Sequence, residues 1–194
     1  MSVIRNILFS GVGGQGILLA SELTAEALLQ AGYDVKKSEV HGMAQRGGSV
    51  TAQLRYGERV YSPLIDPGTT DIQMAFEMME AVRYLPYLKQ DSTVIVNTQK
   101  ILPPSVATGQ AVYPENVLDE LSKRDIRVIG VDAFAIAKEA GEVRTANVAL
   151  VGALSVHLDV DASVFESIIE QRVPQRFLKE NMKAFAGGRA AGSE

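Results

Sequence analysis

Two glycine-rich segments near the start of the chain contain the groups that are best suited to chemistry. The first reads Gly11-Val12-Gly13-Gly14-Gln15-Gly16, with the spacing G-x-G-x-x-G. It joins a short apolar run, residues 4–10, to a helical pattern over residues 17–32. At such a strand-to-helix turn, free N–H groups at the start of the helix can bind a phosphate. Glu39 follows the last glycine by about 20 residues, as the acid does in dinucleotide-binding fingerprints.

The same glycines also have a purely structural explanation. A sharp turn from a strand into a helix needs a residue that tolerates a positive φ, whether or not a ligand is bound. The sequence leaves the two interpretations open. On the first, the candidate cofactor-binding residues are Gly11, Gly13, Gly14, Gln15 and Gly16.

The second segment, residues 39–49, combines glycines with three polar side chains. Its candidate site residues are His41, Gln45, Arg46, Gly47 and Gly48. A guanidinium beside open backbone suits a carboxylate, a phosphate or an acidic side chain of a partner. The alternative is a Gly-Gly turn with a solvated arginine and a structural histidine. The pattern places no Ser or Asp partner for His41, so no catalytic role is assigned to any residue.

Composition excludes several classes of function. With 194 residues and 46% hydrophobic residues, the chain can bury a sizeable core. A net charge of −4 without a basic block argues against nucleic-acid binding. The absence of cysteine excludes disulfides, thiolate-bound iron–sulfur clusters and a thiol nucleophile. The chain has only two histidines, so the sequence predicts no metal site. Because neither a signal peptide nor an apolar run of spanning length is found, we expect a cytoplasmic protein with no membrane contact.

The hydrophobic pattern predicts an α/β fold: a Rossmann-like, mostly parallel sheet with helices on both faces. We expect one domain over residues 1–186 and a flexible tail of small residues over 187–194. An inserted β-hairpin, residues 49–65, should turn at Gly57 and lie beside the glycine loop. Pro86 should interrupt the helix that begins near Glu77, and Asp132 should cap a later helix. Further strands are expected over residues 33–40, 71–76, 93–97 and 127–131, and further helices over 116–122, 148–158, 161–170 and 174–185.

Several of these strings together resemble a known family. The string G-V-G-G-Q-G-I-L-L-A-S is similar to the start of the gamma-type domain of 2-oxoacid:ferredoxin oxidoreductases. Members of that family also carry an R-G-G loop at the place of Arg46-Gly47-Gly48. The version here, H-G-M-A-Q-R-G-G-S-V, resembles the beta subunit of the indolepyruvate branch, since the pyruvate and 2-oxoglutarate branches usually show P-E-x-R-G-G. The stretches F-E-M-M-E-A-V-R-Y-L-P-Y-L and V-I-V-N-T fit as well, so the resemblance runs from Ile4 to about Phe185.

The resemblance implies a subunit that is inactive alone. A large (alpha) partner subunit would carry thiamine diphosphate and 4Fe–4S clusters, and this chain would bind neither. The complex would oxidatively decarboxylate an aryl 2-oxoacid, with coenzyme A as acyl acceptor and ferredoxin as electron acceptor. The glycine loop would form a backbone cradle, and His41, Gln45, Arg46 and Gly47 would reach the shared active site. Whether the isolated chain self-associates is left open.

Two other functions remain open from the residues themselves. The fingerprint and Glu39 are compatible with a freestanding NAD- or FAD-binding dehydrogenase, although no substrate domain follows. Alternatively, both glycine segments serve only packing and assembly, and the chain is a non-catalytic scaffold.

Overall fold

The described residues, 4–41, 48–102 and 104–193 of this computed structural model, form a six-stranded sheet in the order β2-β3-β1-β4-β5-β6. Three neighbouring pairs, β1–β4, β4–β5 and β5–β6, are parallel, whereas β3 runs antiparallel to both β1 and β2. The strands are β1 Arg5–Val12, β2 Asp34–His41, β3 Ser49–Gly57, β4 Thr70–Ala75, β5 Leu88–Asn97 and β6 Ile126–Val131.

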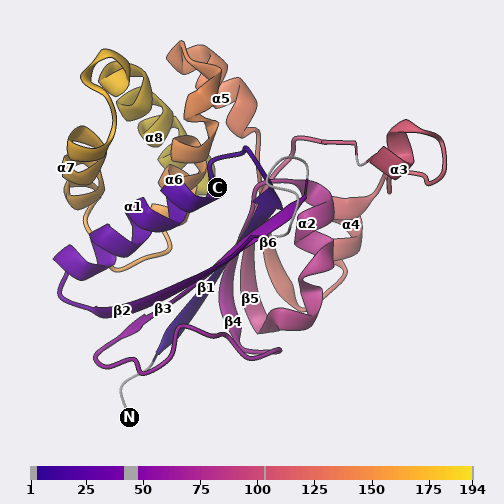
Figure 1. Cartoon of the computed structure of the whole chain (residues 1–194), viewed down its shortest axis with the longest axis horizontal. Coiled ribbons are helices and arrows are strands. Elements are labelled where there is room, and N and C mark those ends of the chain that lie inside the picture. The colour runs from indigo at the N-terminus through magenta and orange to yellow at the C-terminus, as the bar shows by residue number, and fades with distance from the viewer. Residues whose placement is uncertain (1–3, 42–47, 103, 194) are drawn as a thin grey trace.

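Helices cover both faces of this sheet, but unequally (Figure 1). One face carries the larger hydrophobic core, beneath α1 and α5 to α8, and the other carries a smaller core beneath α2 and α4. The predicted fold class, mixed α/β with helices on both faces, is therefore confirmed. The helices are α1 Ile17–Gln30, α2 Met78–Arg83, α3 Pro104–Ala107, α4 Val117–Ser122, α5 Ala133–Ala140, α6 Ala146–Ser155, α7 Ala162–Arg172 and α8 Leu178–Gly192.

Local signals in the sequence account for several of these boundaries. The alternating residues Val50, Ala52, Leu54 and Tyr56 of β3 all enter the larger core, as their spacing predicts. The helix α2 ends at Arg83, before a short 3₁₀ turn that contains Pro86. The Asp132 carboxylate caps α5, because it accepts a hydrogen bond from the Ala135 N–H at 2.9 Å.

The predicted hairpin over residues 49–65 is wrong in its second half. The antiparallel partners of β3 are β2 and β1, so both of its edges already carry hydrogen-bonded ladders. Residues 58–69 form no strand. Instead, the Arg55 side chain donates to the carbonyl oxygens of Ser62 and Leu64, each at 3.1 Å, and the Gln53 side chain accepts from the Ile65 N–H at 2.7 Å. This strap, residues 58–65, is therefore attached to side chains of β3 and not to its backbone.

Residues 187–192, predicted as part of a flexible tail over 187–194, form the last turns of α8 in the structure. Gly188 and Gly192 are buried in the contact between α6 and α8. A Cβ atom on Gly188 would lie 1.8 Å from the Ala149 carbonyl oxygen, and one on Gly192 would lie 2.6 Å from that of Ala153. Small residues on both helices thus permit backbone contact. The sequence misleads here because a run of Gly and Ala suits a tail as well as a close helix interface.

None of the helices in the described part of the chain is both long and apolar enough to cross a lipid bilayer.

The close contact between α6 and α8 predicts different effects for two adjacent glycines. Gly188→Ala should lower the free energy of unfolding by about 2–3 kcal/mol, since its methyl group would overlap the Ala149 carbonyl. Gly187→Ala should change it by less than about 1 kcal/mol, because its Cβ would meet the movable Ile136 side chain while helix propensity improves. Urea unfolding of both variants measures the difference. Equally small effects would show that residues 187–192 do not pack as described.

Candidate functional site at the glycine-loop edge

The parallel strands β1, β4, β5 and β6 end at one edge of the sheet, and the glycine loop lies there between β1 and α1. In open α/β sheets, ligands bind at this carboxyl edge, where helices leave toward opposite faces. Here α1 follows β1 onto the face of the larger core, and α2 follows β4 onto the opposite face. The chain thus places its glycine fingerprint at the position that the fold offers for a ligand.

The glycines of this loop have different roles. Gly16 has φ 78° and begins α1, and a Cβ there would lie 2.5 Å from the Asn147 amide nitrogen. A Cβ on Gly11 would lie 2.7 Å from the Phe76 Cβ. These two glycines are therefore required by conformation and packing alone. Gly14, with φ 101°, has no atom of the described residues within 4 Å of its Cβ position, so nothing in the described structure covers its backbone.

The two glycine-rich segments predicted from the sequence meet at their ends. The Gly13 N–H donates to the Gly48 carbonyl at 2.9 Å, and Val12 pairs with Ser49 across β1 and β3. His41 ends β2, where it is paired with Val50. The remaining candidates of the second segment, Gln45, Arg46 and Gly47, lie outside the described residues.

Side-chain amides connect the ends of the parallel strands. The Gln15 side chain accepts from the Val12 N–H at 2.8 Å and donates to the Phe76 carbonyl at 2.8 Å. The Asn97 amide donates to the same carbonyl at 3.1 Å and accepts from the Ala133 N–H at 3.3 Å. Together these bonds link the ends of β1, β4 and β5 to the start of α5. Of these two amides, only Gln15 is predicted from the sequence as a site residue, and there it is a candidate cofactor-binding residue and not a bridge between strand ends.

A cavity of about 410 Å³ lies beside this chain of amides. Its wall combines the glycine loop with apolar and amide side chains: Gly14, Gln15, Gly16, Phe76, Asn97, Gln99, Ile101, Phe134, Val143, Arg144, Ala146, Asn147 and Leu150. This volume falls in the range of small-molecule sites. The lining residues outside the glycine loop could not be predicted from the sequence, because they come from separate elements as distant in the chain as β5 and α6.

Among the described residues that line the cavity, Arg144 carries a charge, and its guanidinium is paired with Glu142. The Arg144 guanidinium lies 5.0 Å from the centre of the Phe177 ring, and that of Arg176 lies 4.8 Å from it. Arg144 also binds Glu142 through two hydrogen bonds of 3.0 and 2.9 Å, which lower the pKa of Glu142 to about 2. Arg176 has no acidic partner within the described part of the chain.

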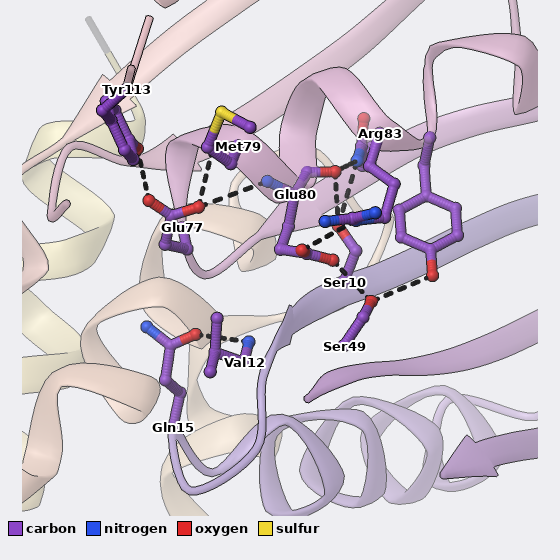
Figure 2. Close-up of polar contacts among 11 residues, drawn as sticks. Ser10, Val12, Gln15, Ser49, Glu77, Met79, Glu80, Arg83 and Tyr113 are labelled. Atoms are coloured by element: carbon purple, nitrogen blue, oxygen red, sulfur yellow. Dashed lines mark hydrogen bonds and ion pairs between the residues drawn. The ribbon is translucent and has the colours of Figure 1, made fainter. Parts of the chain in front are cut away.

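Two buried carboxylates from α2 and the residue before it stabilise another part of the same edge (Figure 2). Glu77, 1% exposed, accepts from the N–H groups of Met79, Glu80 and Ile101 and from the Tyr113 hydroxyl. Burial, and then the bond to Glu77, raise the pKa of Tyr113 above its ordinary value, so the hydroxyl keeps its proton. Glu77 thus fastens the connection that contains Ile101 and Tyr113 onto α2.

Glu80, 4% exposed, holds the first residue of β3. It accepts from the Ser49 hydroxyl at 2.6 Å and from the Arg83 guanidinium at 2.9 Å. The buried positions of Glu77 and Glu80 could not be predicted from the sequence, since acids spaced three apart in F-E-M-M-E are typical of a solvated helix face. The position of Glu77 directly before the helix was the one available signal, because that is the N-cap position.

The arrangement suits binding and positioning more than bond breaking. The buried acids are occupied as hydrogen-bond acceptors, and the cavity offers amides, open backbone and an arginine. Such groups can hold an anionic or heteroaromatic ligand and orient it.

The chain is similar to known proteins over nearly its whole length. The family model described as pyruvate ferredoxin/flavodoxin oxidoreductase matches residues 6–191. The indolepyruvate oxidoreductase subunit IorB of Thermococcus kodakarensis is 42% identical, covering 97% of this chain and 96% of the relative. IorB of Archaeoglobus fulgidus is 43% identical, covering 94% of this chain and 92% of the relative. The keto/oxoacid ferredoxin oxidoreductase gamma subunit of Geobacter sulfurreducens has a similar structure, with a TM-score of 0.72 and 25% identity over 97% and 98% of the two chains.

The resemblance predicted from the two glycine segments is confirmed by these matches over nearly the whole length. Members of the family are subunits of oxidoreductase enzymes. The chain belongs to the pyruvate ferredoxin/flavodoxin oxidoreductase family, in which it is a small subunit similar to IorB.

Proposed function

We propose that this chain is the small subunit of an indolepyruvate:ferredoxin oxidoreductase, an enzyme that oxidatively decarboxylates aryl 2-oxoacids. The observation that carries the proposal is the near full-length similarity to two IorB subunits, at 42% and 43% identity. In balanced form, the 2-oxoacid, coenzyme A and two oxidised ferredoxins give an acyl-CoA, carbon dioxide, a proton and two reduced ferredoxins.

The donor groups of this chain support a proposal about which subunit binds the cofactors. An iron–sulfur cluster needs thiolate ligands, and the chain has no cysteine. The chain also lacks a G-D-G…N-N thiamine signature. We therefore propose that thiamine diphosphate and the 4Fe–4S clusters are held by the large (alpha) subunit, where they supply carbanion stabilisation and electron transfer. Coenzyme A enters as a substrate, and ferredoxin acts through the complex.

The proposed contribution of this chain is to position one wall of the shared active site. The Gly13–Gly48 contact sets the glycine loop against the start of β3, and the Ser49–Glu80 bond fixes that start to α2. The segment with His41, Gln45, Arg46 and Gly47 enters β3 at this anchored point. We propose that it faces the large subunit near the bound substrate or coenzyme A.

The NAD- or FAD-binding alternative is less well supported by the geometry. Because β3 lies between β1 and β2, Glu39 is on a strand that does not neighbour β1, and its carboxylate lies 2.6 Å from the Lys37 amine. A dinucleotide fingerprint needs that acid on the neighbouring strand. The scaffold alternative is tested by activity per assembled complex, as described next.

The proposal predicts activity only for the assembled enzyme. The purified chain alone should not reduce a viologen dye with indolepyruvate, thiamine diphosphate and coenzyme A, because it cannot ligate the electron-transfer clusters. Co-expression with the large subunit should give a brown complex that does. Dye reduction by the isolated chain, or a complex that turns over equally well without this chain, would contradict the proposal.

A conservative change tests the role of Arg46. In the complex, Arg46→Lys should lower kcat/KM about tenfold or more, because lysine cannot reproduce a bidentate bond to an anion. The free energy of unfolding should change by no more than about 0.5 kcal/mol. Arg124→Lys is the matched control, since Arg124 is exposed next to the amino end of β6, at the opposite edge of the sheet. Unchanged kinetics in the Arg46→Lys complex would favour a scaffold role for this segment.

A further inference from the structure

The strand β2 forms one edge of the sheet. It is the first strand in the sheet order, and within the described part of the chain β3 is its one strand neighbour. An edge strand directs alternate N–H and C=O groups outward, where a further strand can pair with them. The eight residues of β2, D-V-K-K-S-E-V-H, include no proline or glycine that would interrupt such pairing.

Two opposite charges lie on one face of this edge. Val35 packs against the larger core, so Lys37 and Glu39, two and four residues further on, lie on the same face. The Lys37 amine donates to the Glu39 carboxylate at 2.6 Å and lies 4.0 Å from the Glu22 carboxylate of α1. The side chains of Lys37 and Glu39 are 22% and 26% exposed, so a strand that pairs with β2 would bring its own side chains against them.

These charges select the strand that can pair with β2. Lysine on an edge strand opposes pairing with an unrelated strand, because its ammonium group would lose water without gaining an acid. A matching strand therefore needs an acid opposite Lys37 and a cation opposite Glu39. The β2 strand of a second copy of this chain supplies both, because Lys37 and Glu39 lie on either side of Ser38.

Two-fold symmetry fixes the register of such a pair. When two copies of one strand pair antiparallel in a continuous sheet, one residue lies opposite itself, and its neighbours on either side lie opposite each other. With Ser38 at the centre, Lys37 of each copy lies opposite Glu39 of the other. Centring the pair one residue earlier or later places Lys37 or Glu39 opposite itself, and like charges at such positions are destabilising.

The other face of β2 fits the same register. Lys36, Ser38 and Val40 alternate with the residues of the charged face, so they lie on the opposite side. In the pair centred on Ser38, Lys36 of one copy lies opposite Val40 of the other. Val40 is 55% exposed, and the aliphatic part of a lysine side chain can cover it while the ammonium group stays in water.

This pairing leaves the candidate site accessible. Since β1 and β2 are both antiparallel to β3, they run in the same direction and end at the same edge of the sheet. Antiparallel pairing of two β2 strands therefore directs the two glycine-loop edges toward opposite ends of a dimer. Each of these edges can then meet its own large subunit.

We propose that β2 is a self-association edge, through which two copies of this chain join their sheets in an antiparallel pair centred on Ser38. The proposal does not depend on the proposed catalytic function. A single strand pair is a small interface, and interfaces below about 1,200 Å² are typically weak. The isolated chain should therefore dimerise with a Kd of about 10–100 μM.

Charge reversal tests the pairing. Sedimentation equilibrium of the full chain, over about 5–500 μM, measures the dimer Kd. Lys37→Glu and Glu39→Lys should each weaken dimerisation about tenfold or more, since each variant places like charges opposite each other twice. The double variant Lys37→Glu/Glu39→Lys restores opposite charges in both pairs and should return the Kd to within about threefold of wild type. Lys123→Glu, an exposed charge reversal on the far side of the sheet at the end of α4, is the control and should change nothing.

An introduced cysteine tests the register. The chain has no cysteine, so Ser38→Cys provides one thiol per copy. Because Ser38 lies opposite itself in the proposed pair, mild oxidation should link two copies by a disulfide, both in the isolated chain and in the complex with the large subunit. Ser122→Cys, exposed on α4, is the matched control and should cross-link at least about tenfold more slowly.

Four results would overturn the proposal. The wild-type chain would remain monomeric over the whole concentration range, or Lys37→Glu would dimerise as tightly as wild type. A folded double variant that stays as weak as the single variants would show that charges across β2 do not determine the pairing. Cross-linking of Ser38→Cys in the isolated chain but not in the complex would show that the large subunit covers this edge.

Discussion

The carbonyl oxygen of Phe76, at the end of β4, accepts hydrogen bonds from two carboxamides, and the arrangement of the whole edge depends on it. Gln15 approaches from the glycine loop and Asn97 from the end of β5. A buried carbonyl has two lone pairs, and using both here fixes the glycine loop and the end of β5 relative to the end of β4. Since Gln15 also binds Val12 and Asn97 also binds Ala133, a shift of any one strand end would break bonds at its neighbours.

The same bonds explain why a G-x-G-x-x-G pattern need not mean dinucleotide binding. Its turn is stabilised internally by Gln15, and Gly11 and Gly16 are required by contacts with Phe76 and Asn147. At Gly14, in contrast, no described atom lies within 4 Å of the Cβ position, so the described structure leaves room for another molecule. A fingerprint in sequence therefore combines residues that the fold requires with a residue that a ligand can use, and spacing alone does not separate them.

Most of the fold class was predictable from the sequence, because apolar runs and caps such as Asp132 are local signals. The partners of β3 could not be predicted from the sequence, since strand pairing depends on which edges are free once the whole sheet has formed. The sequence predicts residues 59–65 as the returning strand of a hairpin after the turn at Gly57, but no edge of β3 remains for such a strand.

The candidate site likewise contains residues that could be predicted from the sequence and residues that could not. The two glycine segments were found from composition and spacing, and the structure brings Gly13 and Gly48 together. Asn97 and Asn147 were missed because single polar residues inside apolar segments acquire a role only through tertiary contacts, and Glu77 and Glu80 because their spacing suits a solvated helix face. The resemblance to the family rests on the same two glycine segments and on two further strings, F-E-M-M-E-A-V-R-Y-L-P-Y-L and V-I-V-N-T, that local physics alone does not single out.

The attachment of the strap to side chains has a consequence for local unfolding. Residues 58–65 are connected to β3 through Arg55 and Gln53, whereas β3 itself is held by ladders on both edges. Opening the strap would break the side-chain bonds from Arg55, Gln53 and Asp34 and expose the buried Val60 and Ile65, but it would leave every strand ladder intact. We therefore expect the amides of the strap to exchange with solvent faster than those of β3.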